Sequence, residues 1–265
     1  MKIFYVENQP WRIKIFLFGI RIFSRKKKFK KPKRIITPKT SNAQNTRVIY
    51  TCITGGYDNL IEHNCINLNC DYVCFTDNPT LLNKGKVGVW EIRPVKKITE
   101  DNSLNNRWHK MHPHVLFPNY EDSIYIDGNI DVITKKLFND INSVPTNSFF
   151  AVYKHKTRCC IYQEAKQCML LNKDTPERIT KFVDFLKSEK YPKNFGLTEN
   201  GILYRKHNNP DCIKLMDKWW EFVSTRTRRD QLSLPYLCWK TNIQPYVFKQ
   251  SFSYDELNFK INKHA

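Results

Sequence analysis

Apolar runs alternate with polar, turn-rich segments from residue 48 onward, and this alternation predicts a layered α/β fold. Short runs rich in β-branched and aromatic residues are typical of buried strands, and they occur at 48–54, 72–75, 87–92, 123–126 and 149–153. Apolar residues recur at helical spacing at 103–112, 161–171, 176–187 and 212–223. Asp174, shortly before Pro176, is expected to cap the third of these helices. Strands that alternate with helices predict a largely parallel sheet covered by helices.

The composition is that of a folded domain. With 265 residues, 41% of them hydrophobic and 14% aromatic, the chain is long and apolar enough to form a core without disulfides. Its nine cysteines are odd in number and lie mostly inside apolar runs. They are therefore expected to be reduced core thiols of a cytosolic protein.

Most of the positive charge lies near the N-terminus. Residues 1–47 contain 14 basic residues and one acidic residue, so they carry +13 of the formal net charge of +19. Because the remaining chain is only mildly basic, nucleic acid is not an expected partner. The charge instead defines a basic and aromatic N-terminal arm over residues 1–46.

The arm combines two signals for an anionic membrane surface. Residues 11–23 mix aromatic, aliphatic and cationic side chains. Residues 25–34 are nearly all cationic. They begin a segment, up to residue 47, that is expected to be an unstructured tether. The longest apolar run, 15–20, is too short to span a bilayer and lacks the features of a signal peptide. The alternative is a solvated tail that contacts nothing.

Three segments at the ends of predicted strands can carry chemistry, because ligands of such sheets bind beyond the carboxyl ends of the strands. These segments are 54–58, 76–77 and 127–131. Asp127-Gly128-Asn129 offers a carboxylate, a glycine that permits close approach, and a second oxygen ligand, which suits a hard divalent cation. Such a tripeptide is also a common turn.

A cationic helix face precedes this acidic loop. Arg107 and Lys110 are three residues apart and share a face of the helix predicted at 103–112. A metal and two bases together would balance the charge of a nucleotide diphosphate. The alternative is a solvated basic helix. Three histidines between 109 and 114 could suggest zinc, but Pro113 interrupts the helix that would align them.

Several motifs in order give a specific resemblance. Residues 47–239 resemble the glycosyltransferase-like domain once catalogued as domain of unknown function 616. The resemblance rests on the segments Ile53–Asp58, Phe75–Asp77, Asn106–Lys110, Tyr125–Asn129, Ile161–Ala165 and Arg229–Ser233.

The motif order is also similar to that of glycosyltransferase family 8, a retaining family with the GT-A fold. The resemblance implies an α/β GT-A fold in one domain at 47–250, with a nucleotide-binding half at 47–130, an acceptor-side half at 131–240 and a tail at 251–265. Two departures matter. Asn129 stands where the family has a second carboxylate, and no C-terminal histidine motif of the family 8 kind is found, so a third metal ligand is unassigned.

The resemblance implies sugar transfer from a nucleotide-diphosphate donor, a UDP-sugar, to a glycan or lipid-linked acceptor, with Mn²⁺ or Mg²⁺ as cofactor. Asp127 and Asn129 are the implied metal ligands. The implied donor-binding residues are Thr54, Gly55, Tyr57, Asp77, Arg107, Lys110, Asp127 and Asn129. The implied residues that face the sugar or the acceptor are His155, Arg158, Glu164, Asn200 and Gly201.

Asp230 and Gln231 are the implied catalytic pair that faces the donor sugar. Their alternative role is a helix cap followed by surface polar residues. The resemblance favours retention of configuration, although Glu164 could serve as the base of an inverting reaction, so the stereochemistry stays open.

The leading hypothesis is a glycosyltransferase at the inner face of the cell membrane that acts in bacterial surface polysaccharide synthesis. One competing hypothesis is a non-catalytic basic adaptor that binds acidic polymers or nucleic acid through residues 25–34. The other is a degenerate member of the family that binds a sugar nucleotide without turnover, which Asn129 would permit. Acidic residues at strand ends beside Arg107 and Lys110 favour an enzyme over an adaptor.

Overall fold

An eight-stranded mixed sheet forms the centre of the protein. The computed structural model describes residues 4–9, 12–17, 20–26 and 34–265. The strand order is β14-β12-β13-β10-β5-β7-β9-β8. The bounds are β5 (Arg47–Ile53), β7 (Asp71–Thr76), β8 (Lys86–Val87), β9 (Trp90–Pro94), β10 (Asp122–Ile126), β12 (Phe150–Lys154), β13 (Thr198–Arg205) and β14 (Tyr246–Phe248). The neighbours β10, β5, β7 and β9 are parallel, whereas β13 is antiparallel to β10 and β12.

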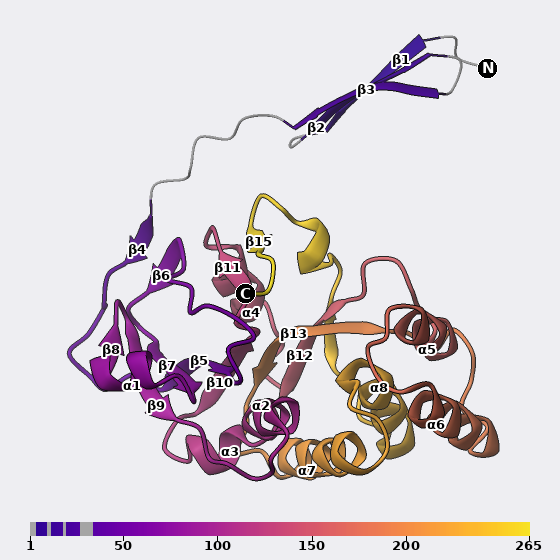
Figure 1. Cartoon of the computed structure of the whole chain (residues 1–265). Helices are drawn as coiled ribbons and strands as arrows, with labels where there is room; N and C mark the ends of the chain where they lie inside the picture. The colour runs from indigo at the N-terminus through magenta and orange to yellow at the C-terminus, as the bar shows by residue number, and fades with distance from the viewer. Residues whose placement is uncertain (1–3, 10–11, 18–19, 27–33) are drawn as a thin grey trace.

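Helices cover both faces of the sheet. Most of the helical residues lie on one face, where Tyr50 and Phe150 pack in one buried cluster with Trp219 (Figure 1). On the other face, Ile49 and Ile126 pack with residues of α4. Neighbours such as Ile49 and Tyr50 reach opposite faces because successive strand side chains alternate. The helices are α1 (Pro79–Lys84), α2 (Asn102–Met111), α3 (Pro113–Leu116), α4 (Lys136–Asn142), α5 (Ile161–Leu170), α6 (Pro176–Ser188), α7 (Pro210–Thr225) and α8 (Asp230–Thr241).

The predicted α/β architecture is confirmed, with local corrections. The run at 87–92 is not one strand, because the chain reverses at Gly88, where φ is 57°, and β8 pairs antiparallel with β9. Asp174 does not cap α6. Thr175 does so, because it directly precedes Pro176 and its hydroxyl accepts a hydrogen bond from the Arg178 amide.

The packed body extends beyond the limits expected from the sequence. Within the expected tether, β4 (Ile35–Thr37) pairs in parallel with β6 (Cys65–Asn67). Within the expected tail, η1 (Phe252–Tyr254) contributes the buried side chain of Phe252, and β15 (Phe259–Ile261) pairs with β11 (Ile130–Val132). The body therefore includes residues on both sides of 47–250.

Residues near the N-terminus form a second, small sheet. It consists of β1 (Phe4–Gln9), β2 (Arg12–Leu17) and β3 (Ile20–Lys26), paired antiparallel in that order. Figure 1 shows this sheet apart from the body. Most of the cationic run at 25–34 lies outside the described residues. No helix in the part of the chain that the structure describes is long and apolar enough to cross a membrane.

All nine cysteines are free thiols, and all but Cys159 are buried. The expectation of unpaired core cysteines is therefore confirmed at eight positions.

Candidate functional site

The turn after β5 brings two strand ends and a helix together. Gly55 has a φ of 62°, and a Cβ there would lie 2.5 Å from the side-chain amide nitrogen of Asn102, so a larger residue would strain the turn and displace Asn102. The Gly55 amide donates to Asp77 Oδ2 at 2.8 Å, just beyond β7. The Thr54 hydroxyl donates to the Asn102 carbonyl at 2.8 Å and ties the turn to the start of α2. Thr54, Gly55 and Asp77 thus meet at the carboxyl end of the sheet.

Two cations of α2 lie between carboxylates from different elements. The Lys110 ammonium is 2.8 Å from Asp230 Oδ2 and 3.4 Å from Asp127 Oδ1, and its side chain is only 1% exposed. Arg107 Nε lies 3.9 Å from Asp230 Oδ2. A buried ammonium requires such carboxylate partners, because an uncompensated charge in the interior is costly. The predicted cationic face of this helix is therefore largely buried rather than solvated.

Asp230 is held as an anion. Burial alone would raise its pKa, but Arg107, Lys110 and Arg229 outweigh burial and hold the pKa well below its usual range. Asp230 is the first residue of α8, where the helix dipole also favours a negative charge. The N-cap of α8 is Arg229, so Asp230 is the first residue of the helix and not its cap, and its side chain is buried.

The Asp127 carboxylate is more open than that of Asp230, with 35% of its side chain exposed against 5%. Its amide donates to the Gly201 carbonyl at 2.8 Å, and a Cβ at Gly201 would lie 3.1 Å from Asp127 Oδ2. The Asn200-Gly201 segment of β13 therefore borders Asp127. Asp58 also lies close to Asp127. Burial and the charge of Asp127 raise the pKa of Asp58, whereas His264 acts to lower it.

The C-terminal segment crosses the same edge of the sheet. The His264 Nδ1 atom is 2.7 Å from Asp58 Oδ1, and its ring lies 4.2 Å from the ring of Tyr57 between centroids. The Asn129 side-chain amide donates to the Asn262 carbonyl at 3.2 Å. The structure thus places Asn129 against this segment. It also places Tyr57 and Asp58 next to His264, which is 206 residues from Asp58 in the sequence.

The carboxylates near Asp127 suit a divalent cation only when a bound ligand supplies further oxygen atoms. Among the described residues, no three His, Cys, Asp or Glu side chains are grouped so that they could hold a metal ion. Asp58 and Asp127 nevertheless place two carboxylates close together, and the raised pKa of Asp58 reflects their mutual repulsion as well as burial. Mg²⁺ typically binds to one or two carboxylates and completes its shell with water and substrate phosphates. A cation is therefore expected to bind here with a diphosphate rather than alone.

A second charged cluster lies beyond the end of β12. Arg158 Nε is 2.5 Å from Glu164 Oε2, and His155 Nε2 is 3.8 Å from the same oxygen. His155 Nδ1 accepts hydrogen bonds from the amides of Thr157 and Arg158. Burial lowers the pKa of His155, although Glu164 opposes this effect.

The beginning of β13 lies between the two clusters. Gln231 donates from its side-chain amide to the Thr198 carbonyl at 3.1 Å, and the Lys156 amide donates to Glu199 Oε1 at 3.3 Å. The structure therefore brings Asp230, Gln231 and the Asn200 segment together, with His155, Arg158 and Glu164 to one side.

Comparison with known proteins gives the family. The model for the TOD1/MUCI70 glycosyltransferase-like domain matches residues 35–263. The chain belongs to this family. The match includes β4 and the C-terminal segment, as the packed body does, and it confirms the resemblance to a glycosyltransferase-like domain. The similarity of motif order to family 8 stays a prediction.

Among the relatives of this TOD1/MUCI70 domain is a probable hexosyltransferase, MUCI70, from Arabidopsis thaliana. It is 27% identical over 163 residues, which cover 56% of this chain and 27% of the plant protein. The chain thus spans about a quarter of that relative. Similar solved structures include mouse xyloside xylosyltransferase 1 in its apo form, with a TM-score of 0.42, 7% identity, and coverage of 76% of this chain and 83% of that chain. Another is GlyE of Streptococcus pneumoniae TIGR4, with a TM-score of 0.43, 10% identity, and coverage of 78% of this chain and 46% of that chain.

The TOD1/MUCI70 domain keeps several buried donors unpaired around the acidic residues. These donors are Arg107 Nε, Tyr125 Oη, Asn200 Nδ2 and Arg229 Nε. Buried polar groups are normally hydrogen-bonded, so an unpaired set near one site indicates groups available to a ligand. The Lys110 ammonium lies 4.9 Å from the centre of the Tyr125 ring.

Sequence reasoning did not select Tyr125, Asp58 or His264. Tyr125 precedes Asp127 by two residues, so the period of a strand could have assigned both to one face. Asp58 was visible at the end of the Gly-Gly-Tyr-Asp turn. No local signal marks His264, which reaches the site only because β15 pairs with β11.

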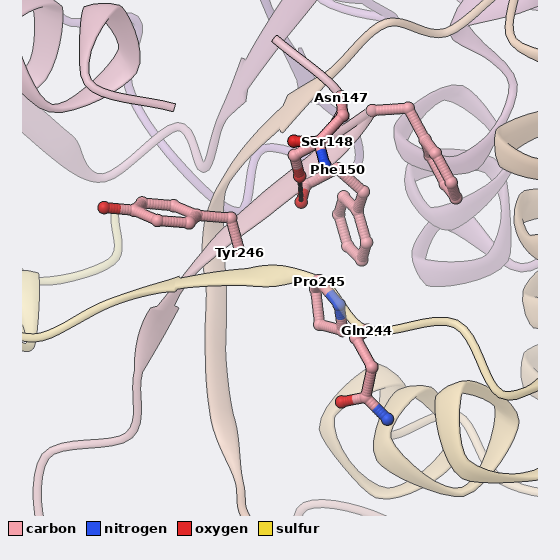
Figure 2. A pocket seen from close by; sticks show the side chains of 7 residues that line it. Asn147, Ser148, Phe150, Gln244, Pro245 and Tyr246 are labelled. Atoms are coloured by element: carbon pink, nitrogen blue, oxygen red, sulfur yellow. Dashed lines mark hydrogen bonds between the residues drawn. The ribbon is translucent and has the colours of Figure 1, made fainter. Parts of the chain in front are cut away.

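A cavity among the described residues lies away from this site. It measures about 280 Å³ and lies at the start of β12 and β14, lined by Asn147, Ser148, Phe149, Phe150, Gln244, Pro245 and Tyr246. Figure 2 shows the side chains of Tyr246 and Gln244 extending in different directions. Because β12 and β10 are both antiparallel to β13, this cavity is at the end of the sheet opposite Asp127. It has no Asp, Glu, Lys or Arg in its lining and is not suited to a diphosphate.

Proposed function

We propose that this TOD1/MUCI70 domain is a retaining, metal-dependent glycosyltransferase that moves a sugar from a UDP-sugar to a glycan or lipid-linked acceptor. The observation that carries the proposal is the position of Lys110 and Arg107, which lie between Asp127 and Asp230 at the carboxyl ends of β10 and its neighbours. Two cations and two carboxylates in one partly buried cluster can bind a diphosphate and stabilise a cationic sugar centre.

The donor diphosphate would bind on the Asp127 side, which is the more open side. Asp127, with Asp58 beside it, and the side-chain oxygen of Asn129 would hold Mn²⁺ or Mg²⁺ jointly with phosphate oxygens, while the Asn129 amide nitrogen bonds to the Asn262 carbonyl. The cation supplies charge neutralisation for the departing diphosphate. Arg107, whose Nε atom has no hydrogen-bond partner, and Lys110 would add charge-assisted hydrogen bonds. Thr54, Gly55, Tyr57 and Asp77 would shape the nucleotide side.

The sugar would lie against Asp230 and Gln231. As the bond between C1 and the phosphate oxygen breaks, its electron pair leaves with the diphosphate and positive charge develops on the sugar ring. The ionised Asp230 carboxylate stabilises that charge. The acceptor oxygen bonds to C1 from the same face, and its proton passes to the leaving phosphate oxygen, so the configuration is retained.

The acceptor would approach from the second cluster. His155, Arg158 and Glu164 lie beyond β12, and Asn200 and Gly201 separate them from Asp127. We assign the enzyme to the cytoplasmic face of the cell membrane, where a lipid-linked acceptor of surface polysaccharide synthesis would be available, on the basis of the positive charge of residues 1–47.

The test is turnover by the purified full chain. UDP-, GDP-, CDP- and dTDP-sugars are incubated with Mn²⁺ or Mg²⁺, and release of nucleoside diphosphate and the anomeric configuration of the product are measured by NMR. We expect release from a UDP-sugar, and a loss of about a hundredfold in Asp230→Asn, which keeps the shape but removes the charge. The control is Asp217→Asn, because the Asp217 side chain is 55% exposed and lies on α7.

Each other outcome contradicts the proposal in a distinct way. A thermal shift with a sugar nucleotide but no turnover would identify the degenerate, binding-only member. Absence of both a shift and turnover across the panel would favour the non-catalytic adaptor. Inverted product would overturn retention and favour Glu164 as a base.

A further inference from the structure

The N-terminal sheet has one apolar face. In β1 and β2, Phe4 pairs with Leu17 and Val6 with Ile15. In β2 and β3, Ile15 pairs with Phe23 and Leu17 with Ile20, with an irregularity between these two pairs. Paired residues lie on the same face, and residues two apart in a regular strand do so too. Among the residues whose side chains the structure describes, the common face therefore includes Phe4, Val6, Ile15, Leu17, Ile20 and Phe23.

This apolar face is open to solvent in the isolated chain. Phe4 is 58% exposed, Ile20 is 70% exposed and Phe23 is 45% exposed. In Figure 1 the sheet stands apart from the body. A small sheet of three strands needs something to pack against its apolar face, and contiguous exposed apolar surface of this kind marks an interaction site.

The charge of the surrounding chain indicates what covers this face. Residues 1–47 carry a net +13, and Arg21, which pairs with Phe16 in the sheet, is exposed. A second copy of the chain would bring two such cationic arms together, and their repulsion opposes the contact. An anionic lipid surface attracts each of these cations instead.

We propose that the face formed by Phe4, Val6, Ile15, Leu17, Ile20 and Phe23 lies flat in the interface of an anionic bilayer. The proposal deepens the membrane location given under the proposed function and rests on it. The sheet does not enter the hydrocarbon core, because its edge strands have unpaired amide and carbonyl groups that need water. The attachment thus combines apolar burial by a folded sheet with electrostatic attraction, which are the two signals that stable peripheral binding requires.

The test uses the full chain and vesicles of phosphatidylcholine with or without phosphatidylglycerol in a sedimentation assay. We expect binding to the anionic vesicles that weakens as salt rises. The double variant Ile20→Ser with Phe23→Ser should partition about a hundredfold more weakly, as expected from the loss of two large apolar side chains. The matched control is Val115→Ser with Leu170→Ser, which removes two exposed apolar side chains from the body, 51% and 77% exposed, and should bind as the native chain does.

Two results would overturn the proposal. One is equal partitioning of the native chain and the Ile20 and Phe23 variant. The other is a lipid-free dimer, detected by light scattering, that the same variant dissociates, because this would assign the face to a second copy of the chain. Nucleoside diphosphate release is measured on all variants without vesicles and should be unchanged, so failure of membrane binding is distinguishable from failure of the proposed enzymatic function.

Discussion

The two charged clusters at the carboxyl end of the sheet are built differently. In the cluster around Lys110, one carboxylate directly follows β10 and the other begins α8. Lys110 and Asp230 are 120 residues apart in the sequence. In the cluster around Glu164, both partners of the carboxylate lie within nine residues of it, at His155 and Arg158. The first cluster is assembled by the tertiary structure, whereas the second is largely local.

The difference has a chemical consequence. Around Lys110, Asp127 is partly open, and the Nε atom of Arg107 makes no hydrogen bond, so an anionic ligand with a cation can be accommodated by exchange of ion-pair partners. Around Glu164, the carboxylate already contacts an arginine and a histidine. That cluster is better suited to a neutral, hydroxyl-bearing ligand. The comparison supports a donor side at Asp127 and an acceptor side at Glu164.

The largest effect is expected at Asp127. Asp127→Asn removes the charge that would hold the cation and should lower turnover of a UDP-sugar with Mn²⁺ by about a thousandfold. Removal of the metal with EDTA should have a similar effect on the native enzyme and little further effect on the variant. Calorimetry should also show that Mn²⁺ binds weakly alone and tightly with UDP. Full activity in Asp127→Asn would show that the UDP-sugar and its cation do not bind at this cluster.

A loss of stability is expected when Lys110 is replaced. Lys110→Met leaves Asp230 buried without its closest partner, which should cost about 3 kcal/mol in the free energy of unfolding. The double variant Lys110→Met with Asp230→Leu should recover only part of this stability in urea titrations, because Arg107 then loses its carboxylate partner, and it should remain inactive. If the urea midpoint of unfolding is the same for Lys110→Met as for the native protein, the buried ion pair does not have the assigned structural role.

A smaller and selective effect is expected at Glu164. Glu164→Gln keeps the shape of the side chain and should raise the KM for the acceptor by about tenfold, a typical cost of one weakened charge-assisted contact. Release of nucleoside diphosphate in the absence of acceptor should be unchanged. Equal losses in both assays would show that the two clusters act on the same ligand.

The smallest effect concerns pH. Burial lowers the pKa of His155, so the folded protein favours the neutral ring more than the unfolded chain does. The corresponding stability is present above the unfolded pKa of about 6.5 and declines as pH falls through the folded pKa. Urea titrations from pH 7.5 downward should therefore show a smaller decline for His155→Gln than for the native protein. Parallel curves would indicate that His155 does not contribute to the acid sensitivity.

Local patterns predicted the framework but missed one of its central strands. The β-branched run of β5 and the helical spacing of α2 are visible in the sequence because propensity and periodicity act over short distances. β13 was not predicted as a strand, since it begins with Thr198, Glu199 and Asn200, which are typical of a loop. These polar residues are tolerated in the sheet because Glu199 accepts hydrogen bonds from Lys156 and Ser251.

The sequence by itself determined the α/β class, the basic arm and the residue types at the strand ends. Gly55 and Asp127 could be selected because a tight turn and an acidic strand end have local signatures. Only the tertiary structure decided that Lys110 pairs with Asp230, that His264 reaches Asp58, and that the N-terminal strands present one apolar face. These contacts depend on strand order, register and burial, which arise when distant segments pack together and which no short stretch of sequence encodes.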